Sequence, residues 1–313
     1  MHRIQTVCII GAGTQGTMLA FRSLAYGKDV FLYSRSQNSR DRALLKIRHW
    51  LSDWEQAGKL MHITPDEAMR RLTLFSDLES SVRDADLVIE NVSEDLELKQ
   101  RIWCQIDAAA PERTLLTTNS SSFTTTAIGK EVRRKDKTFN LNFMTPTQDD
   151  LVEVMWNVHT STETKALALD FLKEQNQVPV VTKKEIKGFS LNRVWRAIKK
   201  EALKLWAEGY TTPEDFDRAW MLEWGTPYGP FGLMDRVGLD VVEQIEMSYY
   251  SESRKEDDLP PKALSELVKQ GFLGEKSGKG FYYYPNPSYQ NPFFLRGEEE
   301  CKSSNNLGTL ENF

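Results

Sequence analysis

The glycine-rich stretch GAGTQG at residues 11–16 constrains the fold of this chain more than any other stretch. An apolar run typical of a buried strand, TVCII at 6–10, precedes it, and a helical pattern follows it. In a GxGxxG loop the first glycine permits a tight turn and the second lets backbone approach a pyrophosphate. The third lets the helix pack closely against the strand. The context predicts a dinucleotide-binding βα unit, with candidate cofactor contacts at Gly11, Gly13, Gln15 and Gly16.

The first half of the chain alternates strand-like and helical patterns. Helical segments separate most of the early strands, and a charged helical stretch at 39–71 carries Trp50 and Trp54 on one face. Such alternation predicts an α/β, Rossmann-type doubly wound sheet, mostly parallel, with helices on both faces. The further strands are expected at residues 30–33, 72–75, 86–90, 115–118, 139–143, 151–155 and 179–182.

The second half has a different pattern, beginning at about residue 184. Apolar residues recur at helical spacing over 189–207, and further helices are expected at 213–222, 230–250 and 260–270. These segments predict an all-helical C-terminal domain. The stretch from Pro285 is rich in Asn, Ser, Pro and Glu, and predicts a loose tail. We therefore expect a dinucleotide-binding domain at 1–183, a helical substrate and dimerisation domain at 184–284, and a tail at 285–313.

Composition excludes several classes of function. The net charge of −5 gives no electrostatic case for nucleic-acid binding, and no apolar run reaches the roughly 18 residues of a membrane span. The N-terminus shows no secretory signal, and the three cysteines form no CxxC pair, which indicates a reducing cytoplasm. The four histidines lack metal-ligand spacing, so no metal site is expected.

The residues after the second strand bear on the choice of dinucleotide. A site for NAD usually places Asp or Glu there to bind the ribose 2′-hydroxyl. This chain has YSRS at 33–36, without a carboxylate that would repel a 2′-phosphate. Arg35 can pair with that phosphate, and Ser34 or Ser36 can add a hydrogen bond. The pattern favours NADP, with NAD as the alternative.

Several longer stretches resemble the L-3-hydroxyacyl-CoA dehydrogenase family over residues 5–285. They include VIENVSEDLELKQ at 88–100, TNSSSF at 118–123 and KGFSLNR at 187–193, which is similar to a PGF-x-x-NR pattern. PYGPFGLMDRVGLD at 227–240 and GEKSGKGFYYY at 274–284 resemble the family's helical domain. The resemblance implies a homodimer formed through that domain.

The resemblance also implies roles for individual residues. Glu94 and Lys99 match cofactor-contacting residues, and Asn119 matches a residue beside the nicotinamide. Ser121 matches the serine that hydrogen-bonds the substrate's C3 oxygen. Asn192 matches an asparagine that faces substrate at the domain boundary.

One position departs from the family pattern. The family uses a histidine, oriented by a glutamate, to remove the hydroxyl proton as hydride leaves C3. Counting from Ser121, the histidine position is Asn142, while the glutamate is matched by Glu153 across a loop one residue shorter than the pattern. An amide can donate and accept hydrogen bonds, but it cannot act as a general base.

Three hypotheses follow from this replacement. The first keeps a carbonyl/alcohol reaction, in which Ser121 and Asn142 polarise the oxygen and water, Asp149, Asp150 or Glu153 supplies the proton. The second is reduction of a C=N bond, since a protonated iminium needs only hydride. The third is a cofactor-binding protein without turnover.

The substrate is also left open by the sequence. A 3-oxo or 3-hydroxy acyl thioester or a related hydroxy acid fits the resemblance, and NADP favours the reductive direction because cells usually keep that pool reduced. Arg40 and Lys46 are candidates for binding the phosphates of an acyl-CoA.

Overall fold

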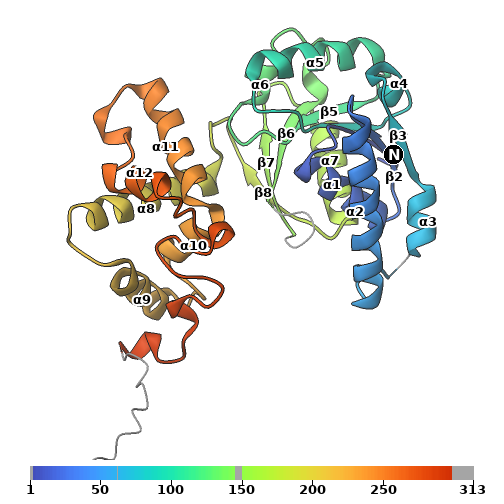
Figure 1. Cartoon of the computed structure of the whole chain (residues 1–313). Helices are drawn as coiled ribbons and strands as arrows, with labels where there is room; N and C mark the ends of the chain where they lie inside the picture. Colours follow the sequence, from blue (N-terminus) through green and yellow to red (C-terminus); the bar gives the residue numbers. More distant parts are fainter. Residues whose placement is uncertain (1–2, 62, 145–149, 298–313) are drawn as a thin grey trace, which may run out of the picture. The chain divides into compact units, whose positions relative to one another are not determined.

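The computed structural model describes residues 3–61, 63–144 and 150–297. The chain divides into two compact units, Met1–Leu191 and Asn192–Phe313. The first contains the strands and the second contains helices (Figure 1). The boundary lies after Leu191, beyond the expected boundary at 183. Ser190 and Leu191, which begin a long helix, are hydrogen-bonded to Glu153 in the first unit and so belong to it.

The first unit is built on one eight-stranded sheet in the order β3-β2-β1-β4-β5-β6-β7-β8. Every pairing is parallel except that of β6 with β7, which is antiparallel. The prediction of a mostly parallel, doubly wound sheet is confirmed. The strands are β1 (Thr6–Ile10), β2 (Asp29–Tyr33), β3 (Leu72–Phe75), β4 (Leu87–Glu90), β5 (Leu115–Thr118), β6 (Thr138–Phe143), β7 (Leu151–Trp156) and β8 (Val178–Thr182).

Helices cover both faces of this sheet because its central strands are apolar on both sides. Val7 and Ile9 of β1 belong to one core cluster, and the intervening Cys8 and Ile10 belong to the other. The first cluster includes residues of α1 (Thr14–Ala25), α2 (Gln37–Gln56), α3 (Pro65–Arg70) and α7 (Thr162–Glu174). The second includes residues of α4 (Leu78–Val82), α5 (Leu96–Ala109) and α6 (Thr125–Ile128).

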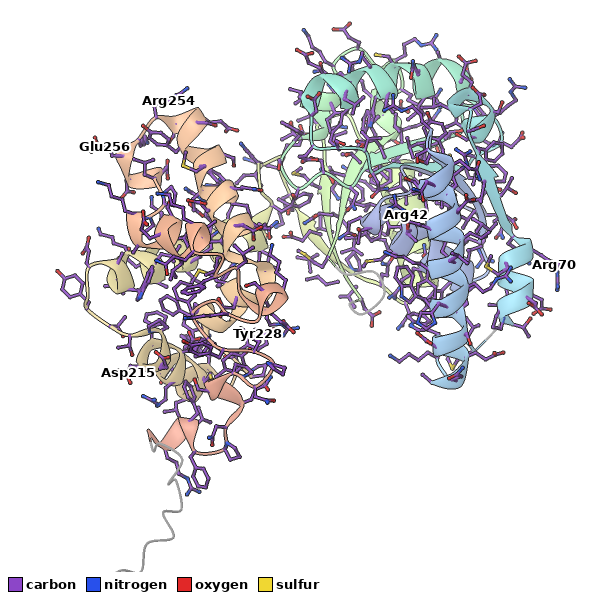
Figure 2. All side chains as sticks on the ribbon, in the orientation of Figure 1. Arg42, Arg70, Asp215, Tyr228, Arg254 and Glu256 are labelled. Carbon is purple, nitrogen blue, oxygen red and sulfur yellow. The ribbon has the colours of Figure 1, made fainter. Side chains whose placement is uncertain are left out.

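The charged stretch at 39–71 contains two helices, α2 and α3. Helix α3 begins at a capping box, in which the Thr64 side chain accepts from the Glu67 backbone and the Glu67 carboxylate accepts from Thr64 N–H. Trp50 and Trp54 both pack edge-on against Phe21 of α1, as their spacing predicts. Arg42 of α2, labelled in Figure 2, is exposed.

The second unit contains α8 (Ser190–Ala207) from Asn192 onward, α9 (Pro213–Trp224), α10 (Pro230–Val237), α11 (Leu239–Ser253) and α12 (Lys262–Lys269). The helix expected at 230–250 is broken at Gly238, whose φ of 102° only glycine adopts readily. Trp206 packs against Phe231 and Phe281 of the same chain, so its burial needs no partner subunit.

Two buried carboxylates organise this helical core. Asp217 accepts hydrogen bonds from the Phe231 and Gly232 backbone N–H groups at the start of α10. Asp235 accepts from the backbone of Phe281 and Tyr282. Burial raises the pKa of each carboxyl to about 6.

The stretch after Pro285 differs from the loose tail that its composition suggests. Tyr289 and Phe294 are buried in the helical core, where the Tyr289 ring lies 4.9 Å from that of Tyr282. Arg218 of α9 also donates to the Phe294 carbonyl at 2.6 Å. Residues 285–297 are thus part of the helical unit, and the remainder of the expected tail lies outside the described residues.

Candidate active site

The glycine loop has the geometry that a dinucleotide needs. Gly11 has a φ of 116°, and a Cβ on it would lie 2.7 Å from the Asn91 carbonyl oxygen. A Cβ on Gly16 would lie 1.8 Å from the Gly11 carbonyl oxygen, so only glycine allows α1 to approach β1 this closely. A Cβ on Gly13 would meet nothing within 4 Å, which leaves space in front of the helix.

The amino end of α1 is suited to an anion. The N-cap of α1 is Gly13, which has no side chain to bond the first backbone N–H groups, and the first turn of α1 carries no acidic residue. These N–H groups and the helix dipole therefore favour a pyrophosphate. Gln15 donates to the Met144 carbonyl at 3.0 Å, which ties this helix start to the end of β6. A dinucleotide pyrophosphate therefore fits at this loop.

The turn after β2 leaves Arg35 exposed, with no hydrogen bond or ion pair among the described residues. The Ser36 hydroxyl caps the 20-residue helix α2 by accepting from Ser39 N–H. Arg40 is buried, and its guanidinium donates to the Ser34 carbonyl and to Gln37. Arg40 thus braces this turn and is not available to hold an acyl-CoA phosphate, whereas Lys46 is exposed on α2.

A buried ion pair lies at the carboxyl end of β4. Glu90 is 0% exposed, and its carboxylate accepts from the Lys99 ammonium at 2.8 Å and from Val92 N–H at 2.7 Å. The hydroxyl of Thr118, at the end of β5, donates to the other oxygen at 2.8 Å. Lys99 is also 3.2 Å from Glu94. Lys99 is 1% exposed, so the structure places this predicted cofactor contact within a supporting network.

Glu94 holds the loop that carries Ser121. Its carboxylate accepts from the Ser120 hydroxyl and from Ser122 N–H, the residues on either side of Ser121. Ser121 itself is exposed and makes no hydrogen bond within the described part of the chain. Its hydroxyl is therefore free to bind a ligand at the carboxyl end of the sheet.

Asn119 connects the ends of three strands. Its amide nitrogen donates to Asn91 after β4 at 2.9 Å, and its oxygen accepts from Phe143 N–H of β6 at 2.9 Å. Asn140 of β6 donates to the Ser120 carbonyl at 3.0 Å. These bonds bring the predicted residue Asn119 and the Ser121 loop to the same sheet edge as the end of β6.

Asn142 and Glu153 lie directly opposite each other on the antiparallel strands β6 and β7. Asn142 is 5% exposed and Glu153 is 0% exposed. The Asn142 amide nitrogen donates to Glu153 Oε2 at 3.1 Å. Glu153 Oε1 accepts from the Ser190 hydroxyl and from Leu191 N–H, each at 3.0 Å. The paired positions expected from the sequence are thus in direct contact.

The other expected proton sources are less available. Asp150 forms an ion pair with the buried Arg22 at 2.7 Å, and Asp149 lies outside the described residues. Asn192 is half-buried on the first turn of α8, within the helical unit.

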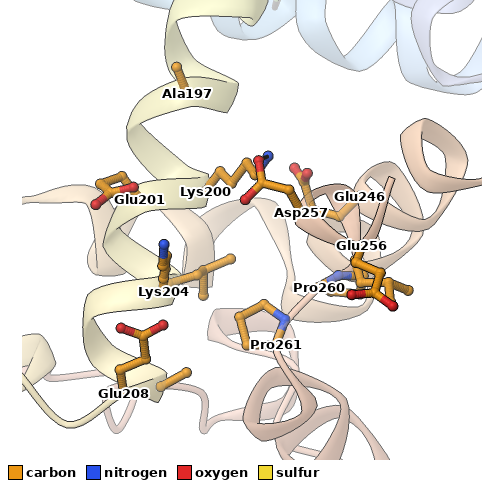
Figure 3. Close-up of a pocket in the computed structure, with 13 residues that line it drawn as sticks. Ala197, Lys200, Glu201, Lys204, Glu208, Glu246, Glu256, Asp257, Pro260 and Pro261 are labelled. Atoms are coloured by element: carbon orange, nitrogen blue, oxygen red, sulfur yellow. Dashed lines mark hydrogen bonds and ion pairs between the residues drawn. The ribbon is translucent and has the colours of Figure 1, made fainter. Parts of the chain in front are cut away.

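A separate hollow of about 470 Å³ lies within the helical unit (Figure 3). Side chains of α8, among them Lys200 and Lys204, line it together with Glu246 and the 256–261 segment. Lys200 points toward Asp257 in Figure 3, and their charged atoms are bonded. None of the predicted site residues lines this hollow.

The described residues contain neither a metal-binding cluster nor a membrane-spanning helix. No group of three or more His, Cys, Asp or Glu side chains there could hold a metal ion. No helix there is long and apolar enough to cross a membrane.

Family models match nearly all of the chain. The NAD-binding domain of 3-hydroxyacyl-CoA dehydrogenase matches residues 6–186, and the C-terminal domain of the same family matches residues 188–284. The chain belongs to the 3-hydroxyacyl-CoA dehydrogenase family. This membership confirms the predicted enzyme class, a dehydrogenase with an NAD-binding domain, and the predicted fold.

Named relatives cover most of this chain. A 3-hydroxybutyryl-CoA dehydrogenase of Clostridioides difficile is 33% identical over 89% of this chain and 99% of its own length. A 3-hydroxyadipyl-CoA dehydrogenase of Escherichia coli is 35% identical over 90% of this chain, which spans 59% of that protein's length. A solved structure described as a diketoreductase of dicarbonyl compounds has a TM-score of 0.83 at 29% identity, covering 91% of this chain and all of that one.

Two residues of the hydrogen-bond networks around the candidate site, Glu90 and Ser190, were not predicted from the sequence. Glu90 ends a strand-like apolar run, and a charged residue at the end of a buried strand could have indicated a buried ion pair. Ser190 gave no such signal, because a hydroxyl at a helix start usually caps its own helix, whereas here it donates to Glu153, 37 residues earlier.

Proposed function

We propose that this 3-hydroxyacyl-CoA dehydrogenase homologue is an NAD(P)-dependent oxidoreductase that moves hydride between a nicotinamide and C3 of a 3-oxo or 3-hydroxy acyl thioester, or of a related hydroxy acid. The observation that carries the proposal is the Asn142–Glu153 hydrogen bond of 3.1 Å at the sheet edge that also carries the Ser121 loop. The relatives' names support the substrate class, since they act on 3-hydroxyacyl-CoA compounds.

The cofactor when bound supplies the hydride, water supplies the proton that the C3 oxygen takes up on reduction, and the chain's own residues bind and orient the reacting groups. The Ser121 hydroxyl is free to donate a hydrogen bond to the C3 oxygen. The Asn142 amide is proposed to donate a second hydrogen bond to the C3 oxygen, and Glu153 holds that amide in place. Asn192, on the first turn of α8, is proposed to contact the substrate. Glu94, Lys99 and Asn119 support the nicotinamide end of the site through the contacts described above.

We propose NADP as the preferred cofactor, with NAD as the alternative. Support comes from the turn at 34–36, where Arg35 is exposed and unpaired among the described residues and the first turn of α2 has no acidic residue. A 2′-phosphate there would gain a guanidinium, serine hydroxyls and the amino end of a long helix. A reduced NADP pool would drive the reaction toward reduction, as the likeness to a diketoreductase also suggests.

Reduction of a C=N bond is the second candidate, and binding without turnover is the third. Asn142 cannot take up a proton as imidazole does, and a protonated iminium would need only hydride. The buried carboxylate of Glu153 is suited to a site that receives a cation.

Assembly and location are also proposals. A homodimer through the helical unit is supported by apolar side chains exposed on α8 and α11, namely Val194, Val241, Ile245 and Met247. The free thiols of Cys8 and Cys104 suit a reducing compartment such as the cytoplasm.

The test is cofactor absorbance with a matched panel of substrates. The protein is mixed with NADPH or NADH and with 3-oxoacyl thioesters, oxo acids and cyclic imines in turn. Oxidation of NADPH with a 3-oxoacyl thioester is expected, and oxidation only with imines would favour the second candidate. Binding of the cofactor without oxidation by any compound would overturn the enzymatic proposal.

A further inference from the structure

Glu153 is a buried carboxylate without a cationic partner. It is 0% exposed, and no Lys, Arg or His forms an ion pair with it among the described residues. A buried charge is costly unless hydrogen-bond donors replace its water. In this chain those donors are all neutral: an amide, a hydroxyl and a backbone N–H.

Two of the three donors come from the start of α8. The Leu191 N–H belongs to the first turn of this 18-residue helix, where backbone N–H groups have no acceptor in the helix itself. The helix dipole further favours a negative charge at that end. Ser190 adds a hydroxyl to the same carboxylate oxygen, Oε1.

The backbone before α8 adopts a conformation that positions these donors. Gly188 has a φ of 80° and Phe189 a φ of 53°, and the Phe189 side chain is 0% exposed. A buried aromatic residue in the left-handed region is uncommon and is kept only where surrounding contacts hold it. Here the turn delivers Ser190 and Leu191 to Glu153.

The hydrogen bonds to Glu153 Oε1 determine which partner is left for Glu153 Oε2. Because Ser190 and Leu191 fix one oxygen, the other points to Asn142 on the facing strand. A carboxylate only accepts, so the amide must turn its NH₂ group toward Glu153. We infer that Ser190 is a positioning residue, which with the start of α8 holds Glu153 and thereby fixes the orientation of the Asn142 amide. The effect of Ser190 on turnover rests on the proposed function, whereas its effect on the orientation of the Asn142 amide does not.

The first experiment is independent of activity. The protein is labelled with ¹⁵N-asparagine, and the side-chain signal of Asn142 is assigned by its loss in Asn142→Ala. Ser190→Ala should shift this signal and speed exchange of its amide protons by at least several-fold, while Ser190→Thr should restore both. The matched control is Ser161→Ala, which removes a hydroxyl that caps α7 through Thr164 N–H at 3.1 Å.

The control separates positioning from simple helix capping. Both serines lie at helix starts, so both alanine variants should lose some thermal stability. Only Ser190→Ala should change the Asn142 signal. If the Asn142 signal is unchanged in Ser190→Ala, as it should be in Ser161→Ala, the inference is wrong and Ser190 is only a helix cap.

A kinetic experiment tests the consequence for turnover. With a substrate found in the panel, Ser190→Ala should lower kcat roughly tenfold, with KM for the cofactor unchanged, since a hydrogen bond to a charged group is lost. Ser190→Thr should recover most of the rate. A panel without any turnover would contradict the proposed function alone, whereas a normal kcat in Ser190→Ala would contradict the positioning role alone.

Discussion

Two buried glutamates of the same sheet are compensated in different ways. Glu90 and Glu153 are both 0% exposed, and each accepts three hydrogen bonds. Glu90 has the ammonium of Lys99 among its donors, whereas the donors to Glu153 within the described residues are all neutral. Glu90 thus belongs to a charged pair below the candidate site. Glu153 belongs to a neutral arrangement at the proposed site, where the resemblance to the family implies a histidine in place of Asn142.

The helical unit repeats the neutral arrangement. Asp217 and Asp235 are buried carboxylates whose donors are backbone N–H groups and tyrosine hydroxyls. Burial raises the pKa of both to about 6, more than these hydrogen bonds lower it. Charging either of these two carboxyls in the folded unit therefore costs stability.

The largest effect is expected from removing the cation beside Glu90. Lys99→Met should lower the free energy of unfolding by about 3–5 kcal/mol, because it leaves a buried charge unpaired. Urea unfolding of the first unit measures this. Lys28→Met is the matched control: Lys28 is equally buried, but its partner Glu174 is 24% exposed, so a smaller loss is expected. The double variant Glu90→Gln/Lys99→Met should recover most of the loss, and an equal loss in the double variant would contradict the pairing.

The second effect is a pH dependence of the helical unit. The pKa of Asp217 is about 6 in the folded protein and 3.8 in an unfolded reference, so the folded unit binds more protons between these values. Its free energy of unfolding should therefore rise as pH falls from about 7 toward 4, by at most about 3 kcal/mol per carboxyl.

Thermal unfolding across this pH range checks the prediction. Asp217→Asn cannot titrate and should flatten the dependence by about half, leaving the share of Asp235. The slope with pH is the quantity compared, because the variant can lose stability at every pH. A slope that stays the same in Asp217→Asn would show that this carboxyl is not responsible.

A smaller effect is expected where a charge is exposed. Arg35 lies on the surface, so its pairing with a 2′-phosphate should be worth only ~1 kcal/mol. Arg35→Gln should weaken NADP binding about fivefold and leave NAD binding unchanged, as measured by thermal shift against cofactor concentration. Stronger stabilisation of the unaltered protein by NAD than by NADP would refute the cofactor preference.

Much of the fold follows from local pattern, and the differences have long-range causes. The strands match their apolar runs to within a residue or two. The break at Gly238 is local: its φ of 102° is one that only glycine adopts readily, and the apolar spacing of 230–250 does not report it. Tyr289 and Phe294 are buried although the surrounding composition is polar, because two aromatic residues suffice to anchor a short segment.

The geometry of the candidate site was predictable where a motif fixes the backbone, as in the glycine loop, and where residues face each other on paired strands, as Asn142 and Glu153 do. It was less predictable where a side chain turns inward. Arg40, one of two candidates for binding an acyl-CoA phosphate, instead braces its own turn. Which donors reach Glu153 depends on the fold after residue 183, which no local pattern encodes.

The direct test of the account is Asn142→His, which gives Glu153 the titrating partner it lacks. The variant and the unaltered protein are compared in the oxidation of a 3-hydroxyacyl thioester, followed by cofactor absorbance, after both are shown to bind cofactor. We expect an increase of about 10²-fold, because a positioned imidazole takes the hydroxyl proton that an amide cannot. An unchanged rate in a folded, cofactor-binding variant would contradict the placement of the reaction at Asn142 and Glu153.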